Sequence, residues 1–151
     1  MRRTFLVRSG AGERAHRSLW WWYWLFTAFA LAASLCGWKS GLAIAFALTA
    51  VQAVHVGASA GSATAFPVQV RIGYLAIIAL SAWTPLAPLQ AVQLAGLLLR
   101  LAFDYCLLAR MVSLLPWNRR GALTLERVRA TFLTPPVEGT IVAALDRRSA
   151  R

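Results

Sequence analysis

The chain has 151 residues, of which 59% are hydrophobic and only 14% are charged. Soluble domains contain about 45–50% apolar and about 25% charged residues, so this composition indicates a protein that lies in a lipid bilayer. The formal net charge is +11, from 16 lysines and arginines against 5 acidic residues. The basic residues flank apolar stretches, as in membrane proteins, so they do not indicate binding to nucleic acid.

The first stretch of the chain is polar and basic. Residues 1–18 contain five arginines and one glutamate, and two glycines there, Gly10 and Gly12, argue against a stable helix. A secretory signal peptide is not expected, because the apolar run that starts at Leu19 is too long and a second one follows at once. We therefore expect residues 1–18 to form a cytoplasmic tail.

Two apolar segments follow. Residues 19–37 carry no charge, and about 20 apolar residues suffice to cross the hydrocarbon core as a helix. The aromatic residues 20–24 at its start are typical of the belt at headgroup level, and a ligand-stacking cage is the alternative. After a turn at 38–41, residues 41–60 form a second predicted span, whose many alanines favour close packing against other helices.

The next two predicted spans lie on either side of a proline turn. Residues 57–67 are rich in Gly, Ser and Ala and end in proline, which predicts a loop. The third span covers 68–84, and Arg71, one turn inside it, can extend to the headgroups. Prolines bracket the turn 85–88. The fourth span, 89–115, is expected to be the longest helix and the only one with charges deep inside it.

The C-terminal part is again basic. Pro116 is expected to end the fourth span, and residues 117–120, Trp-Asn-Arg-Arg, to anchor the chain at the interface. Residues 124–132 have the pattern of a short amphipathic helix with Leu125, Val128 and Phe132 on one face, and basic helices of this kind lie on anionic membrane surfaces. Residues 137–151 are expected to form a basic tail.

The distribution of basic residues predicts the orientation. Five arginines precede the first span and seven follow from Arg119 onward, whereas the intervening turns and loop hold only Lys39. Both ends should then be cytoplasmic, which requires an even number of spans. The predicted fold is an all-α membrane protein of four transmembrane helices in two hairpins, with a short C-terminal interfacial amphipathic helix. Its parts are a tail (1–18), a transmembrane domain (19–117) and a second tail (118–151).

Polar residues within the spans are the best candidates for a functional site, because each is costly in lipid and needs a partner. Arg100 and Asp104 are four residues apart and close enough to pair on one helix face, whereas Arg110 lies on another face. The pair is either a structural ion pair, or part of an ion or proton pathway or of a docking point for an anionic ligand. The candidate intramembrane polar site comprises Arg71, Arg100, Asp104, Cys106 and Arg110.

Other chemistry has little support in the sequence. Cys36 and Cys106 lie in apolar runs and are expected to behave as small buried residues without a disulfide. His55 is a possible proton relay or haem ligand, but the only other histidine, His16, lies in the N-terminal tail. Motifs of metal sites and of soluble enzymes are missing. We therefore expect no cofactor, no metal site and no catalytic residue.

The second half of the chain resembles a known membrane domain. The strings PVQVRIGYLAIIAL and DYCLLARMVSLLPWNR resemble the two-helix domain of YgaP-like proteins, in which it is fused to a rhodanese. That family typically has V-R-x-x-x-G at the start of one helix, and a cysteine-bearing helix that ends in P-W-N-R. The matching residues are Arg71, Cys106, Pro116, Trp117, Asn118 and Arg119, and the resemblance covers about residues 66–120 only.

The resemblance implies a helical hairpin in the bacterial inner membrane, often paired as a dimer, with a suggested link to the export of sulfur compounds. The chain departs from the family in having Arg100 and Asp104 where the family is rich in glycine, in two added N-terminal spans and in lacking a rhodanese domain. The resemblance therefore implies the family's architecture for this chain more strongly than it implies the family's activity.

Three functions are open at this point. The first is a non-enzymatic accessory or scaffold subunit that packs beside other membrane proteins. The alternative is a small transporter or channel for an anion such as a sulfur compound. A membrane enzyme would rest on Asp104, Cys106 and His55 alone. The expected partners are the lipid bilayer and either a second copy of the chain or another membrane protein, and no nucleic acid is expected.

Overall fold

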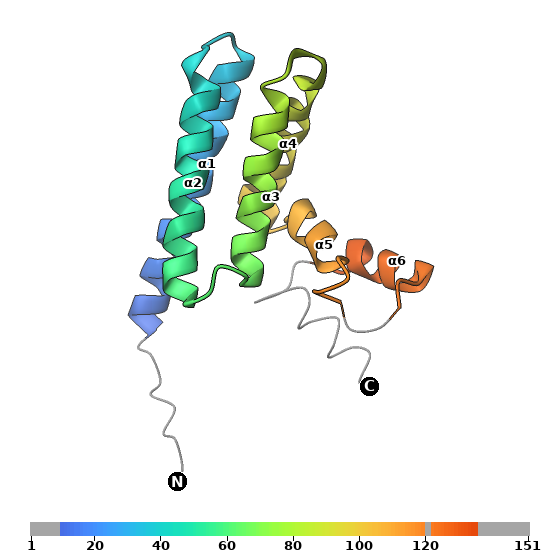
Figure 1. Ribbon diagram of the computed structural model, residues 1–151. Coiled ribbons are helices and arrows are strands. Elements are labelled where there is room, and N and C mark those ends of the chain that lie inside the picture. The colour runs from blue at the N-terminus through green and yellow to red at the C-terminus, as the bar shows by residue number, and fades with distance from the viewer. Residues whose placement is uncertain (1–9, 120–121, 136–151) are drawn as a thin grey trace.

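The computed structural model describes residues 10–119 and 122–135, and for residues 10–18 it describes the backbone alone. Four long helices stand side by side (Figure 1): α1 (Gly10–Leu35), α2 (Ser40–Ala60), α3 (Phe66–Ser81) and α4 (Pro88–Phe103). A 3₁₀ turn, η1 (Thr84–Leu86), precedes α4, and two short helices, α5 (Leu107–Ser113) and α6 (Leu125–Leu133), follow it. The predicted all-α fold is confirmed for the described residues.

The four long helices form two antiparallel hairpins. Helix α1 contacts α2 and α4, and helix α3 contacts the same two, so the four make a closed bundle. The turns between α1 and α2 and between α3 and α4 lie at one end of this bundle. The loop 61–65 lies at the opposite end together with α5 and α6, which run across the direction of the long helices (Figure 1). We call this second end the foot of the bundle.

Glycine and proline define the ends of the long helices. Helix α1 ends in a Schellman motif: Gly37 has φ 95°, and the amide of Trp38 donates to the carbonyl of Ala33 at 3.0 Å. Gly61, with φ 64°, ends α2 in the same left-handed conformation. Pro67 stands in the first turn of α3, where the missing N–H has no cost. These turns follow from local sequence and agree with the predicted boundaries to within a few residues.

Two helix predictions are wrong. Helix α1 begins at Gly10, so its first turns include residues that were expected to form a non-helical tail. The fourth predicted helix, 89–115, is broken: α4 ends at Phe103, and α5 begins only at Leu107. The residue between them, Asp104, has φ 53°, a left-handed conformation that aspartate tolerates better than most residues. At 1.5 Å per residue the unbroken helix would have been about 40 Å long, more than the hydrocarbon core requires.

The bundle buries an apolar cluster that includes Leu31, Ile78 and Leu97 together with hydroxyl and amide side chains, and it exposes many large apolar residues. Thr27, Thr49, Gln52, Ser81, Gln90 and Gln93 are buried, whereas many of the large hydrophobic side chains on the long helices, among them Phe29, Val54, Ile72, Val92 and Leu98, are exposed. Hydrogen bonds between buried groups connect the helices: Gln52 Nε2 donates to Thr27 Oγ1 (3.0 Å), and Gln93 Nε2 donates to the Tyr74 carbonyl (3.1 Å). A soluble bundle seldom exposes so many large apolar side chains.

Two helical segments of the described chain, Ser40–Ala60 and Thr84–Phe103, are long and apolar enough to cross a membrane. In their most apolar stretches only 28% and 17% of the residues are buried, so most of this apolar surface faces outward. The core helix of a soluble protein would be mostly buried. The segments Leu19–Leu35 and Phe66–Ser81 are also apolar but shorter.

Candidate functional site

Three of the five predicted site residues interact electrostatically at the foot of the bundle. Arg71, near the start of α3, has Arg100 and Cys106 as its electrostatic neighbours. Asp104 is attached to this group through an ion pair with Arg100. Arg110 belongs to a separate arrangement with α6. The structure therefore divides the predicted site into two parts.

Arg71 is the most buried charge of the first part, with 8% of its surface exposed. Its guanidinium lies over the rings of Trp20 (5.0 Å) and Trp24 (5.2 Å), so both aromatic faces contribute cation–π attraction. Its Nη1 donates to the carbonyl of Pro67 at 2.9 Å, but its Nε has no acceptor and no accessible surface. The side chain therefore does not reach toward the headgroups as predicted, because the two indoles of α1 hold it inside the bundle.

The aromatic cluster of α1 accordingly has two roles. Trp21 and Trp22 are exposed, which fits the predicted belt at headgroup level. Trp24 is buried, and Trp20 and Trp24 both face the guanidinium of Arg71. This part of the cluster matches the alternative of an aromatic cage, although its occupant is a side chain of the same protein.

Arg100 and Asp104 form the predicted ion pair, the one ion pair between the described side chains. Arg100 is 32% exposed and Asp104 80% exposed, so the pair lies at the surface. The interpretation of Asp104 as a charge deep inside a helix is thus wrong, because the residue ends α4 instead of lying within it. Exposed pairs contribute only about 0–1 kcal/mol to stability.

Tyr74 and Cys106 complete the first part of the site. Cys106 precedes α5, and its Sγ accepts from the amide of Ala109 at 3.4 Å, so it acts as the N-cap of that helix. The side chain of Tyr74 is buried beside Cys106, and its ring packs on Trp24 at 5.0 Å between centroids. Sequence reasoning missed Tyr74, because a tyrosine in an apolar span carries no signal beyond packing. We call Arg71, Tyr74, Arg100 and Cys106 the arginine cluster.

Arg110 is 4% exposed and holds the C-terminal end of α6. Its guanidinium donates to the carbonyls of Thr131 and Pro135, the latter at 3.2 Å, and stacks on the ring of Tyr105 at 4.1 Å. The hydroxyl of Tyr105 donates to the carbonyl of Phe132 at 2.8 Å. The last carbonyls of a helix lack partners within it and carry partial negative charge, so a cation is favourable there.

The predicted amphipathic helix is confirmed as α6, with Thr124 as its N-cap. The hydroxyl oxygen of Thr124 accepts from the amide of Arg127 at 3.2 Å. Leu125 and Leu133 remain exposed, whereas Val128 and Phe132 are half-buried. An apolar surface is therefore still available on the helix after it has docked on α5.

The Pro-Trp-Asn-Arg string connects the end of the bundle to α3. Trp117 Nε1 (2.9 Å) and Asn118 Nδ2 (2.6 Å) both donate to the side-chain oxygen of Gln69, and Asn118 also donates to the carbonyl of Val112. These bonds hold the chain after α5 against the first turn of α3. Trp117 itself is exposed, as expected of an interfacial anchor.

Of the remaining candidates, Cys36 lies apart from the arginine cluster, whereas His55 lies beside Trp20, whose ring also faces Arg71. His55 faces Tyr23, with 3.3 Å between the hydroxyl and Nδ1, and its ring lies 4.9 Å from that of Trp20. Both cysteines have free thiols, and Cys36 is exposed in the turn after α1, contrary to the expected burial. Within the described residues, no group of three or more His, Cys, Asp or Glu side chains could hold a metal ion.

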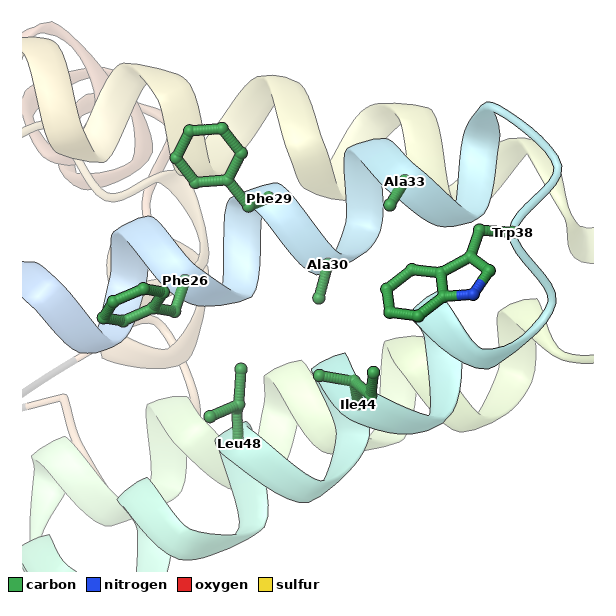
Figure 2. Close-up of a pocket in the computed structure, with 7 residues that line it drawn as sticks. All are labelled: Phe26, Phe29, Ala30, Ala33, Trp38, Ile44 and Leu48. Carbon is green, nitrogen blue, oxygen red and sulfur yellow. The ribbon is translucent and has the colours of Figure 1, made fainter.

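A shallow apolar groove runs between α1 and α2 on the outer face of the bundle. Phe26, Phe29, Ala30 and Ala33 of α1 and Ile44 and Leu48 of α2 line it together with Trp38. Figure 2 shows Ala30 between the two helices and Trp38 at one end of the groove. Its lining offers almost no polar atoms, so it can hold an aliphatic chain but cannot orient a polar ligand.

Comparison of the chain with known protein families, with curated proteins and with solved structures found no match. The resemblance to the YgaP-like membrane domain therefore stays a prediction.

Proposed function

We propose that the chain is an integral membrane protein of four spans in the bacterial inner membrane, and that it acts as a non-enzymatic accessory or scaffold subunit. The observation that carries the proposal is the large apolar surface that the long helices expose, while hydrogen-bonded amides and hydroxyls lie among the core residues. In lipid, burial of apolar residues provides no hydrophobic driving force for the association of helices. Close packing and hydrogen bonds between helices determine instead how the helices associate.

In this proposal, helices α5 and α6 at the foot of the bundle form a platform on the cytoplasmic membrane surface. Helices α5 and α6 lie across the long helices, as expected for segments at the plane of a membrane surface (Figure 1). The exposed leucines of α6 face the apolar boundary, while its arginines suit anionic headgroups. Because Arg110 and Tyr105 bind its carbonyls, the platform is held in one orientation relative to the spans.

Helix α2 offers the surface for a partner helix. Its inner side packs in the bundle through Gly41, Ala45, Thr49, Gln52 and Val56. Its outer side exposes a continuous stripe of small and β-branched residues, namely Ala43, Ala47, Val51, Val54 and Ala58. Small residues at helical spacing let a second helix approach closely in lipid.

The test is cross-linking in native membranes followed by mild detergent extraction. We expect the wild-type chain in a species larger than a monomer. Ala47→Trp, on the stripe, should abolish that species, whereas Val92→Trp, on the exposed side of α4, should retain it. Recovery of the wild type as a monomer alone, or equal effects of both substitutions, would contradict the scaffold proposal.

A second candidate function is a transporter or channel for an anion such as a sulfur compound. The observation that favours it is the electrostatic repulsion between Arg71 and Arg100 at the foot of the bundle. Flux of sulfate and thiosulfate into proteoliposomes is the direct measurement. Transport that is lost in Arg100→Gln would favour this function, and the same flux in empty liposomes would exclude it.

A further inference from the structure

The arginine cluster contains more positive charge than the surrounding side chains compensate. Arg71 is buried, and its charged and titratable neighbours are a second arginine, Arg100, and the thiol of Cys106. The only carboxylate paired with this group in the described chain is Asp104, which binds Arg100 from the exposed side. Two indole faces stabilise the guanidinium of Arg71, but they do not neutralise it.

The hydrogen bonds of Arg71 are also incomplete. Nη1 donates to the Pro67 carbonyl, while the buried Nε–H has no acceptor. A buried donor without a partner is unfavourable, and the cost is greater when the group carries a charge. Native structures rarely retain such a group, and a ligand, an ion or water that occupies the site is one explanation for it.

We infer that the arginine cluster is a binding site for an oxyanion of the phosphate class, held between Arg71 and Arg100. Planar guanidinium groups match the oxygen spacing of phosphate, and two of them supply several charge-assisted hydrogen bonds to one anion. The inference does not rest on the scaffold proposal, because it needs only the bundle itself.

The geometry also indicates how an anion enters. Arg100 is the more exposed of the two arginines and should meet the anion first. Asp104 competes for the same guanidinium, because its carboxylate occupies Arg100 Nη1. Removal of this carboxylate should therefore strengthen anion binding, whereas a purely structural cluster would gain no affinity from it.

Such an anion has two sources, the headgroup of an anionic phospholipid or a free phosphate ion. The foot of the bundle would face the cytoplasmic leaflet, which offers both. The full chain in a neutral maltoside detergent distinguishes them in two parallel measurements. Equilibrium dialysis with labelled inorganic phosphate reports the free ion, and native mass spectrometry with phosphatidylglycerol against phosphatidylcholine reports the headgroup.

Four variants make the test specific to the cluster. Arg71→Gln and Arg100→Gln should each weaken binding about tenfold or more, the effect of losing one charge-assisted hydrogen bond. Asp104→Asn should strengthen it roughly two- to fivefold, because an exposed ion pair that competes with the anion is lost. Arg129→Gln, which removes an exposed charge on α6, is the matched control and should leave binding unchanged.

The site is supported if the wild type binds phosphate, phosphatidylglycerol or both, and if the variants change the affinity as described. The probe that binds identifies whether the anion is a free ion or a lipid headgroup. If Arg71→Gln fails to fold, Arg100→Gln and Asp104→Asn decide, because both residues are partly or largely exposed. Two results would overturn the inference: no binding of either probe to the wild type, or the same affinity in Arg100→Gln, Asp104→Asn and Arg129→Gln.

Discussion

Gly41 occupies the closest approach between α1 and α2. A Cβ atom at this position would lie 2.6 Å from the carbonyl oxygen of Ala30 and 2.7 Å from the amide nitrogen of Ser34. Both are backbone atoms that cannot move without shifting α1. Close contact of this kind is what small residues provide in membrane bundles.

We therefore expect Gly41→Ala to destabilise the bundle by about 1–3 kcal/mol through overpacking. Gly96, in α4, is the matched control, because a Cβ there meets nothing within 4 Å. Gly96→Ala should be neutral or stabilise by up to about 1 kcal/mol, since alanine is the better helix former. Thermal unfolding in detergent, followed by circular dichroism, measures both. A Gly41→Ala protein as stable as wild type would show that the helices are further apart than described.

Substitutions at Asp104 test the cost of its left-handed backbone conformation. Its φ of 53° costs most residues about 1–2 kcal/mol, but asparagine adopts it readily. Asp104→Val should therefore lower the free energy of unfolding by about 1–2 kcal/mol relative to Asp104→Asn. Asp104→Asn itself should cost at most about 1 kcal/mol, because the ion pair to Arg100 is exposed.

The same melting experiment measures these two variants. A loss of about 3–5 kcal/mol in Asp104→Asn is the value expected for a buried pair, and it would restore the interpretation of Asp104 as an intramembrane charge.

At the scale of elements, the break between α4 and α5 is coupled to the docking of α6. Because the chain turns at Asp104, Tyr105 and Arg110 face the C-terminal carbonyls of α6, which an unbroken helix would not allow. The coupling joins residues that are 21 to 27 positions apart in the sequence. Docking of α6 thus depends on two side chains as well as on its apolar face.

Arg110→Gln should release α6 without unfolding the bundle. The substitution removes the donors to the carbonyls of Thr131 and Pro135, and hydrogen bonds to charged groups contribute about 1.5–3 kcal/mol. Hydrogen exchange of residues 125–133 should become faster, while exchange in α1 to α4 stays the same. Arg129→Gln, on the exposed side of α6, serves as the control. Equal protection of α6 in wild type and Arg110→Gln would mean that its apolar face alone holds it.

At the scale of the whole molecule, the two hairpins bring the basic segments to one end. Both turns between paired helices lie at the end opposite the foot, and they contain Lys39 as their only charged residue. Arg71, Arg100, Arg110 and the arginines of α6 all belong to the foot. Under the positive-inside rule this end should face the cytoplasm.

Reporter fusions at residues 39 and 151 test this orientation. We expect the reporter at 151 to be active in the cytoplasm and the one at 39 to be active in the periplasm. Opposite compartments require an odd number of crossings between the two positions, as three further spans provide. Activity of both in the same compartment would leave the four-span arrangement untenable.

The sequence by itself predicted the four long helices, their connection in two hairpins and the concentration of basic residues at one end, but it missed the start of α1 and the break after α4. Apolar runs of sufficient length, glycine at helix ends and proline in first turns act locally, so they can be seen without knowing the partners of each residue. The sequence also singled out Arg71, Arg100 and Cys106, because polar residues in apolar spans are rare.

Only the tertiary structure decided how these residues are used. The capture of Arg71 by Trp20 and Trp24, the burial of Tyr74 beside Cys106 and the binding of α6 by Arg110 are all contacts between separate helices. Periodicity places a residue on a face of its own helix, but it does not specify which helix lies opposite. For the same reason the break at Asp104 was not predicted: no glycine or proline lies nearby, and the contacts of Tyr105 and Arg110 with α6 that accompany the turn join distant parts of the chain.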